Sequence, residues 1–291
     1  MRHNMRIPIG AGLVAAALLV GACDDGTSPS NPALSIALAD SLSEVVATDV
    51  SELAEASSFD ATTGLSLALA RAALAAPPCT PTVEPSPPVN SDADAIPDSI
   101  RIDFTGCTFT RGSVIHTLAG TIDLVDPTPT TTDFSVRHVL TDFSRMLENT
   151  TTDRTIATVR NGTRAIEGTA DTLGHTVSDM PTAYTFANGA TATHVVDWLA
   201  RFEADAPGTI SLGNPLPAGE WTLTGSSDWV RAALSWNVST QTLAPLHFEP
   251  SCTGTPRFDS GTLELTVTRG GATSIVTLAF TACGEYAVTR S

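Results

Sequence analysis

The chain has 291 residues and carries 31 acidic against 15 basic residues, so its formal net charge at pH 7 is −16. Every basic residue is an arginine, and the acids are scattered along the chain rather than gathered in long runs. A body this acidic is repelled by phosphate backbones and by anionic headgroups. This argues against a nucleic-acid partner and against binding to a peripheral lipid surface.

Residues 1–22 have the features of a lipoprotein signal peptide. Two arginines precede an apolar run of about a dozen residues, which is too short for the roughly 20 that span a bilayer. The run ends in VGAC at 20–23, which resembles the lipobox of bacterial lipoproteins, where the cysteine thiol is diacylglycerylated and the signal is cut before it. We therefore expect a lipid on Cys23 that anchors the chain to a membrane. An ordinary cleaved signal is the alternative.

Four further cysteines follow Cys23, and an even number of cysteines in an exported chain predicts two disulfide bonds. We expect the pairs Cys79–Cys107 and Cys252–Cys283, because each closes a loop of about 30 residues, for which chain entropy gives roughly 3–4 kcal/mol of stability. Neither pair has C-x-x-C spacing, which argues against a redox role and against a zinc ribbon.

The first part of the exported chain is predicted to be helical. A polar tether at 23–32 precedes a segment at 33–76 that has apolar residues at helical spacing. Within this segment we expect an amphipathic helix ending near Ala56 and a second helical stretch at 64–76, which stops at two prolines. The apolar face of the second stretch is expected to pack on the main domain, with a partner-binding helix as the alternative.

The rest of the chain is predicted to be an antiparallel β domain at 99–291, reached through a crossing at 77–98 whose seven prolines favour irregular extended structure. Apolar and polar residues alternate in the domain, and we count about a dozen strands with no alternating helices. The pairs NG at 161–162, NG at 188–189 and GG at 270–271 are each expected to join two strands of a hairpin. The predicted fold class is therefore all-β, an antiparallel sandwich or an incompletely closed barrel.

The stretch NSDADAIPD at 90–98 raises the question of a calcium site. Calcium loops place oxygen ligands at alternate positions, and Asp92, Asp94 and Asp98 are the candidate ligands here. However, the third alternate position is Ile96, and no glycine stands where such loops turn sharply. The pattern therefore favours an acidic turn before a strand, with no cofactor, and Ca²⁺ is the alternative.

No motif for catalysis stands out. The five histidines after the signal lack zinc-binding spacing, and we expect them to be surface or cross-strand groups. The chain also lacks the G-x-S-x-G elbow of serine hydrolases, although a glycosidase-like carboxylate pair leaves no motif. Trp221, Trp229 and Trp236 lie in one stretch, where exposed rings could bind a sugar by stacking. The alternative is that they fill the β core.

Several short motifs together resemble a broad group of uncharacterised Gram-negative bacterial outer-membrane lipoproteins with an all-β body. The resemblance spans roughly 79–287, and the chain departs from the group in DADAIPD and in having fewer glycines before Cys107. It implies an elongated antiparallel body with paired cysteines at its two ends, and it implies no activity. Besides the lipobox, the motifs are DSIRIDFTGCT at 98–108, AGTIDL at 119–124, an NG hairpin, EWTLTGSS at 220–227, SCTGTPRFDSGTLELTV at 251–267 and FTACGEY at 280–286.

The sequence thus predicts a membrane-anchored bacterial lipoprotein of the cell envelope, located at the outer membrane. We expect no enzymatic activity and a role in binding or in envelope structure. The expected partners are the membrane, through the lipid anchor, and a glycan or an envelope protein. The alternatives are a secreted hydrolase with a glycosidase-like acidic pair and a lipid-carrying β-barrel.

Overall fold

The computed structural model describes residues 36–58, 79–94, 96–111, 114–132, 134–150, 154–211, 214–231, 234–252 and 256–291. The predicted signal at 1–22, Cys23 with its tether and the helical stretch predicted at 64–76 lie outside these residues.

The described chain forms a helix followed by thirteen strands. Their bounds are α1 (Ile36–Ala56), β1 (Thr82–Glu84), β2 (Ser99–Asp103), β3 (Cys107–Arg111), β4 (Val114–Val125), β5 (Phe134–Asn149), β6 (Arg154–Gly168), β7 (Thr172–Phe186), β8 (Thr191–Ala204), β9 (Gly219–Arg231), β10 (Leu234–Phe248), β11 (Phe258–Arg269), β12 (Ala272–Ala282) and β13 (Glu285–Arg290).

All thirteen strands belong to one antiparallel sheet, in which nearly every strand pairs with the next along the chain. The order is β1-β2-β4-β5-β6-β7-β8-β9-β10-β11-β12-β13, and β3 pairs with β4 beside this path. Within the described residues β1 and β13 are the two edges of the sheet, so the sheet does not close. This confirms the predicted fold class, an all-β body of about a dozen strands that forms an incompletely closed barrel with a helix before it.

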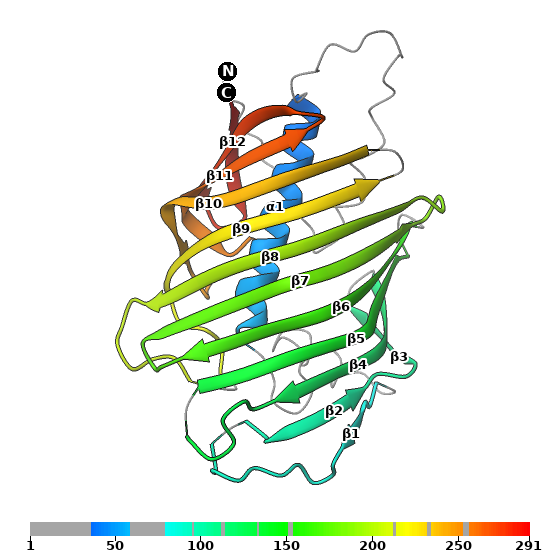
Figure 1. Ribbon diagram of the computed structural model, residues 1–291, viewed down its shortest axis with the longest axis vertical. Coiled ribbons are helices and arrows are strands. Elements are labelled where there is room, and N and C mark those ends of the chain that lie inside the picture. The colour runs from blue at the N-terminus through cyan, green and yellow to red at the C-terminus, as the bar shows by residue number, and fades with distance from the viewer. Residues whose placement is uncertain are drawn as a thin grey trace.

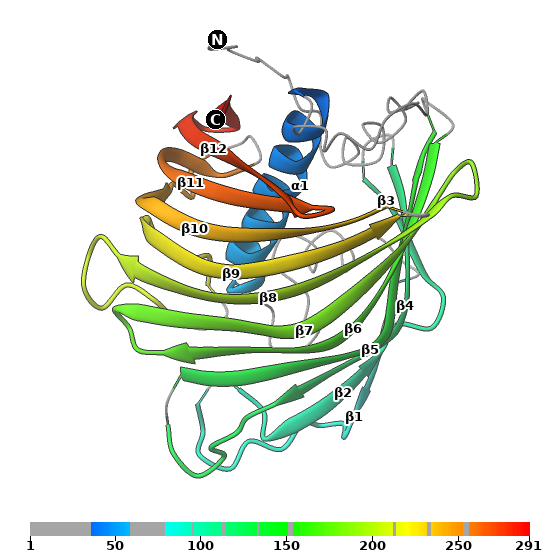
Figure 2. The ribbon, with the colours of Figure 1, turned by 45° about the horizontal axis from the view of Figure 1, so that its top comes forward.

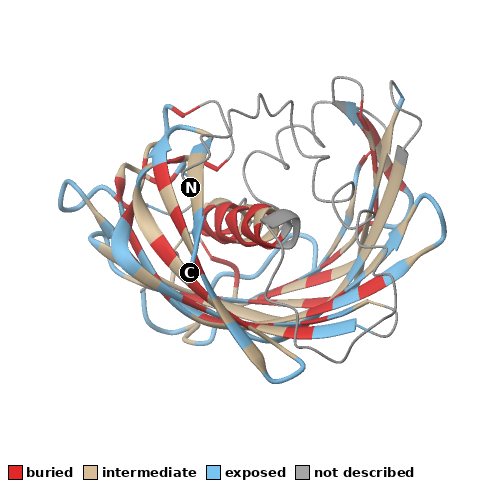
Figure 3. Ribbon diagram, turned by 90° about the horizontal axis from the view of Figure 1, so that it is seen from above, coloured by how far each residue is buried: buried red, intermediate tan, exposed pale blue. Residues whose placement is uncertain are grey.

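The sheet curls around α1, which lies on its concave side (Figures 1 and 2). Seen from above, the strands form a trough and the helix lies inside it (Figure 3). The helix ends at Ala56, as its apolar periodicity predicts, and it presents a buried apolar stripe. This stripe includes Leu42, Val46, Val50 and Leu53. No helix in the described part of the chain combines the length and the apolar character needed to cross a membrane.

Two of the three predicted hairpins are confirmed. The NG pair at 188–189 lies between β7 and β8, and the GG pair at 270–271 joins β11 to β12. Gly189, Gly270 and Gly271 all have positive φ angles, of 78°, 56° and 86°. Glycine adopts such angles at little steric cost, which is why these pairs are reliable turn signals.

The third predicted hairpin, at Asn161–Gly162, is wrong. The dipeptide lies inside β6, which pairs with β5 and β7 both before and after it. The register slips on both ladders at this point, with the extra residue on β5 and on β7, so the dipeptide lies opposite a β-bulge on each side, and Gly162 has a φ of 120°. The Oδ1 atom of Asn161 accepts a hydrogen bond of 2.7 Å from the backbone N–H of Asp142 on β5. Gly162 thus has a positive φ, but it lies inside a strand between two bulged neighbours rather than in a turn.

These bulges belong to a series of register slips that crosses neighbouring strands and bends the sheet. Because a bulge bends its strand and increases the local twist, the series helps the long strands to wrap around α1. The register slips lie at Ala119/Thr121 in β4, Leu140/Phe143 in β5, Arg160/Thr163 in β6 and Val177/Met180 in β7.

Both predicted disulfides are confirmed, and they lie towards opposite ends of the strand order. Cys79–Cys107 ties the proline-rich crossing to the start of β3, and Cys252–Cys283 ties the segment after β10 to the turn between β12 and β13. The crossing also contributes the short edge strand β1, which agrees with the prediction that it holds no central strand.

Candidate functional site

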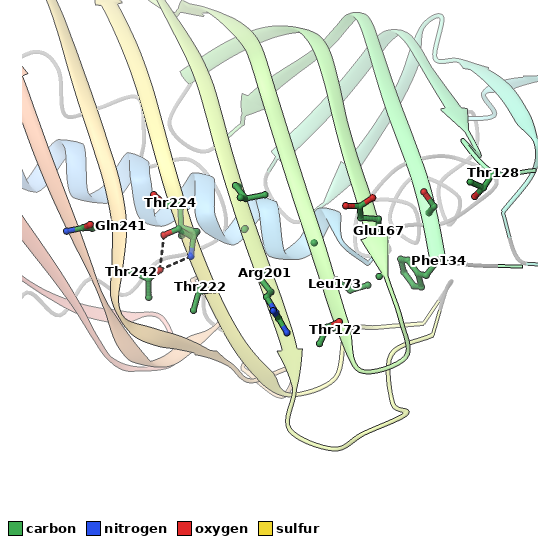
Figure 4. A pocket seen from close by; sticks show the side chains of 16 residues that line it. Thr128, Phe134, Glu167, Thr172, Leu173, Arg201, Thr222, Thr224, Gln241 and Thr242 are labelled. Atoms are coloured by element: carbon green, nitrogen blue, oxygen red, sulfur yellow. Dashed lines mark hydrogen bonds between the residues drawn. The ribbon is translucent and has the colours of Figure 1, made fainter. Parts of the chain in front are cut away.

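A shallow groove of about 930 Å³ crosses the sheet from β5 to β10 (Figure 4). It lies on the outer face, away from α1. Along β8 the side chains of Trp198 and Ala200 are buried in the core, whereas Leu199 and Arg201 between them are exposed and line the groove. The volume falls within the roughly 300–1,000 Å³ typical of small-molecule sites.

One row of the groove is built from lateral neighbours on β6 to β9, namely Glu167, Gly174, Arg201 and Thr222. Gly174 has no side chain, so the row has a gap between the carboxylate of Glu167 and the guanidinium of Arg201. A Cβ atom at Gly174 would lie 3.7 Å from Glu167, an ordinary van der Waals contact, so crowding does not require the glycine. Gly174 thus separates an acidic from a basic side chain along the row.

A second row places an apolar side chain beside polar ones. Leu199 on β8 is 58% exposed, and its lateral neighbours are Thr224 on β9 and then Gln241 on β10. Next to them the Thr242 hydroxyl accepts a 2.8 Å hydrogen bond from the backbone N–H of Leu223 and donates a 3.2 Å bond to its carbonyl (Figure 4). These bonds replace backbone ladder bonds where the β9–β10 register slips. They therefore fix β9 to β10 at the bottom of this end of the groove.

No family model, curated protein or solved structure matches this chain.

The three tryptophans predicted as candidate sugar platforms do not line the groove. Trp221, Trp229 and Trp236 are exposed by only 1%, 5% and 6%, and they belong to the core on the inner side of the sheet. Trp229 stacks on His194, with 3.9 Å between the ring centroids, and more distantly on Trp236. The three rings are therefore not available for stacking on a sugar at the surface, and they fill the β core instead.

The histidines reveal a feature that the sequence did not predict. His116, His138, His175 and His194 are all buried, and only His247 of the five is partly exposed. The only sequence signal for this burial is that the histidines stand at positions where the strand alternation places apolar residues. In the sequence such a position cannot be distinguished from an ordinary cross-strand position.

Three of these histidines belong to a set of polar side chains, most of them buried, between α1 and β5–β8, which we call the inner polar cluster. Arg164 Nε donates a 2.8 Å hydrogen bond to His138 Nδ1, and Arg160 on β6 pairs with Glu52 of α1 at 3.3 Å. The cluster comprises Asp49, Glu52, Ser57, His138, Arg160, Arg164, His175, Thr182 and His194.

Burial keeps the histidines of this cluster neutral. It lowers the pKa of His194 to about 3, with the charge of Arg160 adding to the effect, and it raises the pKa of Asp49 well above its ordinary value. His194 Nε2 and Asp49 Oδ2 lie 3.6 Å apart. Because both shifts favour the uncharged forms, we do not treat this contact as an ion pair.

Ser57 and His175 are the one contact in the cluster with the geometry of a nucleophile and its base, since the hydroxyl lies 2.9 Å from Nδ1. Both residues are buried, and burial lowers the pKa of His175 to about 3, which makes it a weak base. The hydroxyl also donates a 3.2 Å hydrogen bond to the carbonyl of Leu53, within the helix end. The pair therefore fastens the end of α1 to β7 rather than preparing a nucleophile.

The predicted calcium ligands are divided by the structure. Asp92 and Asp94 lie close together, and the acid that joins them is Asp126, just after β4. Asp98 accepts hydrogen bonds of 2.7 and 2.6 Å from the backbone and hydroxyl of Ser91, and these bonds lower its pKa. Ile96 is fully buried in the core.

Proposed function

We propose that this chain is a non-enzymatic binding protein of the bacterial cell envelope, held at the outer membrane by a lipid on Cys23, and that its outer groove binds a glycan. The single observation that carries the proposal is the lining of the groove. It combines hydroxyl, carboxylate, guanidinium and amide groups around one highly exposed leucine.

Glycan recognition needs this mixture, because sugar hydroxyls both donate and accept hydrogen bonds while the C–H face of the ring packs on apolar surface. The Thr222 and Thr224 hydroxyls can do both, whereas Glu167 accepts and Arg201 donates. Leu199 supplies apolar surface among them. The groove crosses six strands, so its length suits an extended chain of sugars better than a compact molecule.

Binding without cleavage is the better-supported activity. Glycosidases use two carboxyl groups about 5–10 Å apart across the scissile bond. Among the described residues that line the groove, Glu167 is the only aspartate or glutamate. The groove therefore supplies half of the acid pair that hydrolysis requires.

A glycan array probed with the detergent-solubilised full chain tests the proposal. We expect a ligand of several sugar units whose affinity falls about tenfold in Leu199→Asn, because this change removes about 1.4 kcal/mol or more of apolar contact. Arg201→Gln and Thr222→Val should each weaken binding as well, since each removes hydrogen-bond donors.

Leu243→Asn is the matched control, because Leu243 is 54% exposed on β10 and does not line the groove. It should leave binding unchanged. No bound glycan at any concentration, or equal losses in Leu199→Asn and Leu243→Asn, would rule out the groove as the site.

A lipid-carrying barrel is the second candidate, because the sheet is open and its inner face near one edge is apolar. The side chains that form this apolar face are already buried, so an acyl chain could bind there only if the packing around them opened. These side chains include Ile100, Ile102, Leu124, Val136 and Leu140, which are at most 4% exposed. Native mass spectrometry of the purified protein decides between the two candidates, since a carrier should release a stoichiometric, non-covalent lipid and a glycan-binding protein should not.

The anchor is tested separately. Metabolic labelling with a radioactive fatty acid should mark the wild-type chain and not Cys23→Ser. The wild-type chain should fractionate with the outer membrane. Labelling that persists in Cys23→Ser would remove the anchor from the proposal and leave the groove untouched.

A further inference from the structure

We infer a calcium site formed by Asp92, Asp94 and Asp126, which joins the proline-rich crossing to the end of β4. One carboxylate oxygen from each of the three residues lies within 4.8 Å of one from each of the others. The three come from two segments more than 30 positions apart, so the fold and not a local motif brings them together.

The backbone around the site is held by hydrogen bonds that bring the two segments into contact. The N–H of Asp126 donates a 3.0 Å bond to the carbonyl of Asp98, and the N–H of Asp98 donates a 2.9 Å bond to that of Val89. Ile96, buried in the core, anchors the loop between the first two acids and Asp98. The residue that breaks the D-x-D-x-D pattern thus fixes the loop in place, and Asp126 supplies the third carboxylate.

The burial of Asp126 separates this cluster from an ordinary acidic surface. The residue is only 3% exposed. Its Oδ1 accepts a 2.8 Å hydrogen bond from the backbone N–H of Thr128, whereas its Oδ2 is buried and accepts no hydrogen bond from any described residue. A buried carboxylate oxygen without a partner is costly, and a bound cation removes that cost.

Asp92 repeats this arrangement. Its Oδ1 accepts a 3.1 Å hydrogen bond from the N–H of Asp94, and its Oδ2 is buried with no hydrogen-bond partner within the described part of the chain. Like-charged carboxylates at this spacing repel each other, and neither Asp92 nor Asp126 pairs with an arginine or histidine among the ion pairs of the described chain. A positive ion would therefore stabilise both.

The donor set selects calcium. Three carboxylates and no nitrogen or sulfur ligand fit a hard cation and do not fit zinc. Calcium accepts flexible, irregular cages of carboxylate, carbonyl and water oxygens, whereas magnesium demands a near-ideal octahedron and gives up its waters reluctantly. A loop that contributes two of the three carboxylates is suited to the larger ion.

Isothermal titration calorimetry of the full chain with CaCl₂ and with MgCl₂, after dialysis against a chelator, tests the site. We expect one calcium per chain and much weaker magnesium binding. The midpoint temperature of thermal unfolding should rise by about 3–10 °C when the calcium concentration is roughly ten to a hundred times the Kd. Asp126→Asn should reduce calcium affinity by at least about 10–100-fold, the range seen when groups supporting a metal site are removed.

Asp123→Asn is the matched control, because Asp123 lies on β4 close to Asp126 but pairs with Arg101 at 2.8 Å outside the cluster. It should bind calcium as the wild type does. Asp92→Asn provides a second ligand variant in case Asp126→Asn does not fold. No saturable calcium binding by the wild type, or unchanged affinity in a folded Asp126→Asn or Asp92→Asn variant, would overturn the inference.

Discussion

The hydroxyl of Ser57, just past the end of α1, lies 2.9 Å from Nδ1 of His175 on the concave face of β7. The histidine is 1% exposed, and burial together with the charge of Arg164 lowers its pKa to about 3. The helix is thus fastened by a histidine that must stay neutral. Protonation of that ring is a specific way to weaken the packing of α1 on the sheet.

The first prediction concerns acid. A histidine with a folded pKa near 3 and an unfolded pKa of about 6.5 contributes stability above pH 6.5 that is lost as the pH falls towards 3. The loss is at most about 1.4 kcal/mol per pH unit for each such histidine. His138 and His194 are shifted in the same direction. Asp49, whose pKa is raised, opposes them by gaining a proton in the folded state.

We therefore expect the free energy of unfolding, measured by urea denaturation, to fall between pH 6 and pH 4. His175→Gln should have a lower stability at pH 7 but a flatter pH profile. The slope of its unfolding free energy against pH should be smaller than that of the wild type by up to about 1.4 kcal/mol per pH unit. Parallel profiles for wild type and variant would show that His175 titrates normally.

The second prediction concerns the contact between Arg160 and Glu52 across the helix–sheet interface. Arg160→Gln should destabilise the protein by about 1–3 kcal/mol, because Glu52 and the hydroxyl of Thr182 both lose their charged donor. Glu52→Gln should cost no more than about 1 kcal/mol, since the Glu52 side chain is 43% exposed and solvent screens it.

Urea denaturation at pH 7 measures both changes, and Arg201→Gln is the matched control. Arg201 pairs with Glu203 at 3.8 Å with both side chains about two-thirds exposed, so its loss should shift stability by no more than about 0.5 kcal/mol. Equal effects of Arg160→Gln and Arg201→Gln would mean that the contacts of Arg160 contribute no more than a surface pair.

The third prediction separates two kinds of glycine. Gly120 has a φ of 85°, and a Cβ atom there would lie 2.1 Å from the carbonyl oxygen of Asp142 on the neighbouring strand. Gly120→Ala should cost about 2–4 kcal/mol, because backbone strain and overpacking add. Gly189 has a φ of 78° in open space, so Gly189→Ala should cost only the strain, about 1–2 kcal/mol. Unfolding curves of equal midpoint for the two variants would contradict the close approach of β4 and β5.

Much of the fold could be predicted because its determinants are local. Adjacent strands pair in chain order, so period-two alternation and turn glycines are enough to predict an antiparallel meander, and nearby cysteines are enough to predict the disulfides. Asn161–Gly162 failed because a glycine with a positive φ also occurs inside a strand that lies opposite a bulge. Only the continued pairing of β6 with both neighbours distinguishes the two.

The sites were less accessible, because residues distant in sequence form them. Asp126 follows a strand in a segment with no acidic pattern. It lies close to Asp92 only because the fold joins the two segments, through the hydrogen bond from its backbone N–H to the carbonyl of Asp98. The groove is lined by polar strand residues that resemble any exposed face. One sequence signal was available, because Leu199 is an apolar residue at a position of β8 where the alternation places exposed residues. It follows Trp198 directly, and the sugar-binding prediction was based on tryptophans, which the structure buries.

The last prediction concerns His247, whose pH dependence has the opposite sign from that of His175. Its Nε2 lies 3.0 Å from Asp205 and its Nδ1 lies 2.8 Å from Asp259, and the hydrogen bond to Asp205 is the main cause of its raised pKa. A raised pKa contributes stability below about pH 6.5 that is lost as the pH rises through the folded value. The effect is small, because solvent reaches all three groups and salt screens them. NMR titration of the imidazole protons should show His247 titrating above pH 6.5 and His175 silent down to pH 4, and His247→Gln should flatten the stability profile on the alkaline side only. A His247 titration at or below its ordinary value would show that the two carboxylates do not hold the ring in solution.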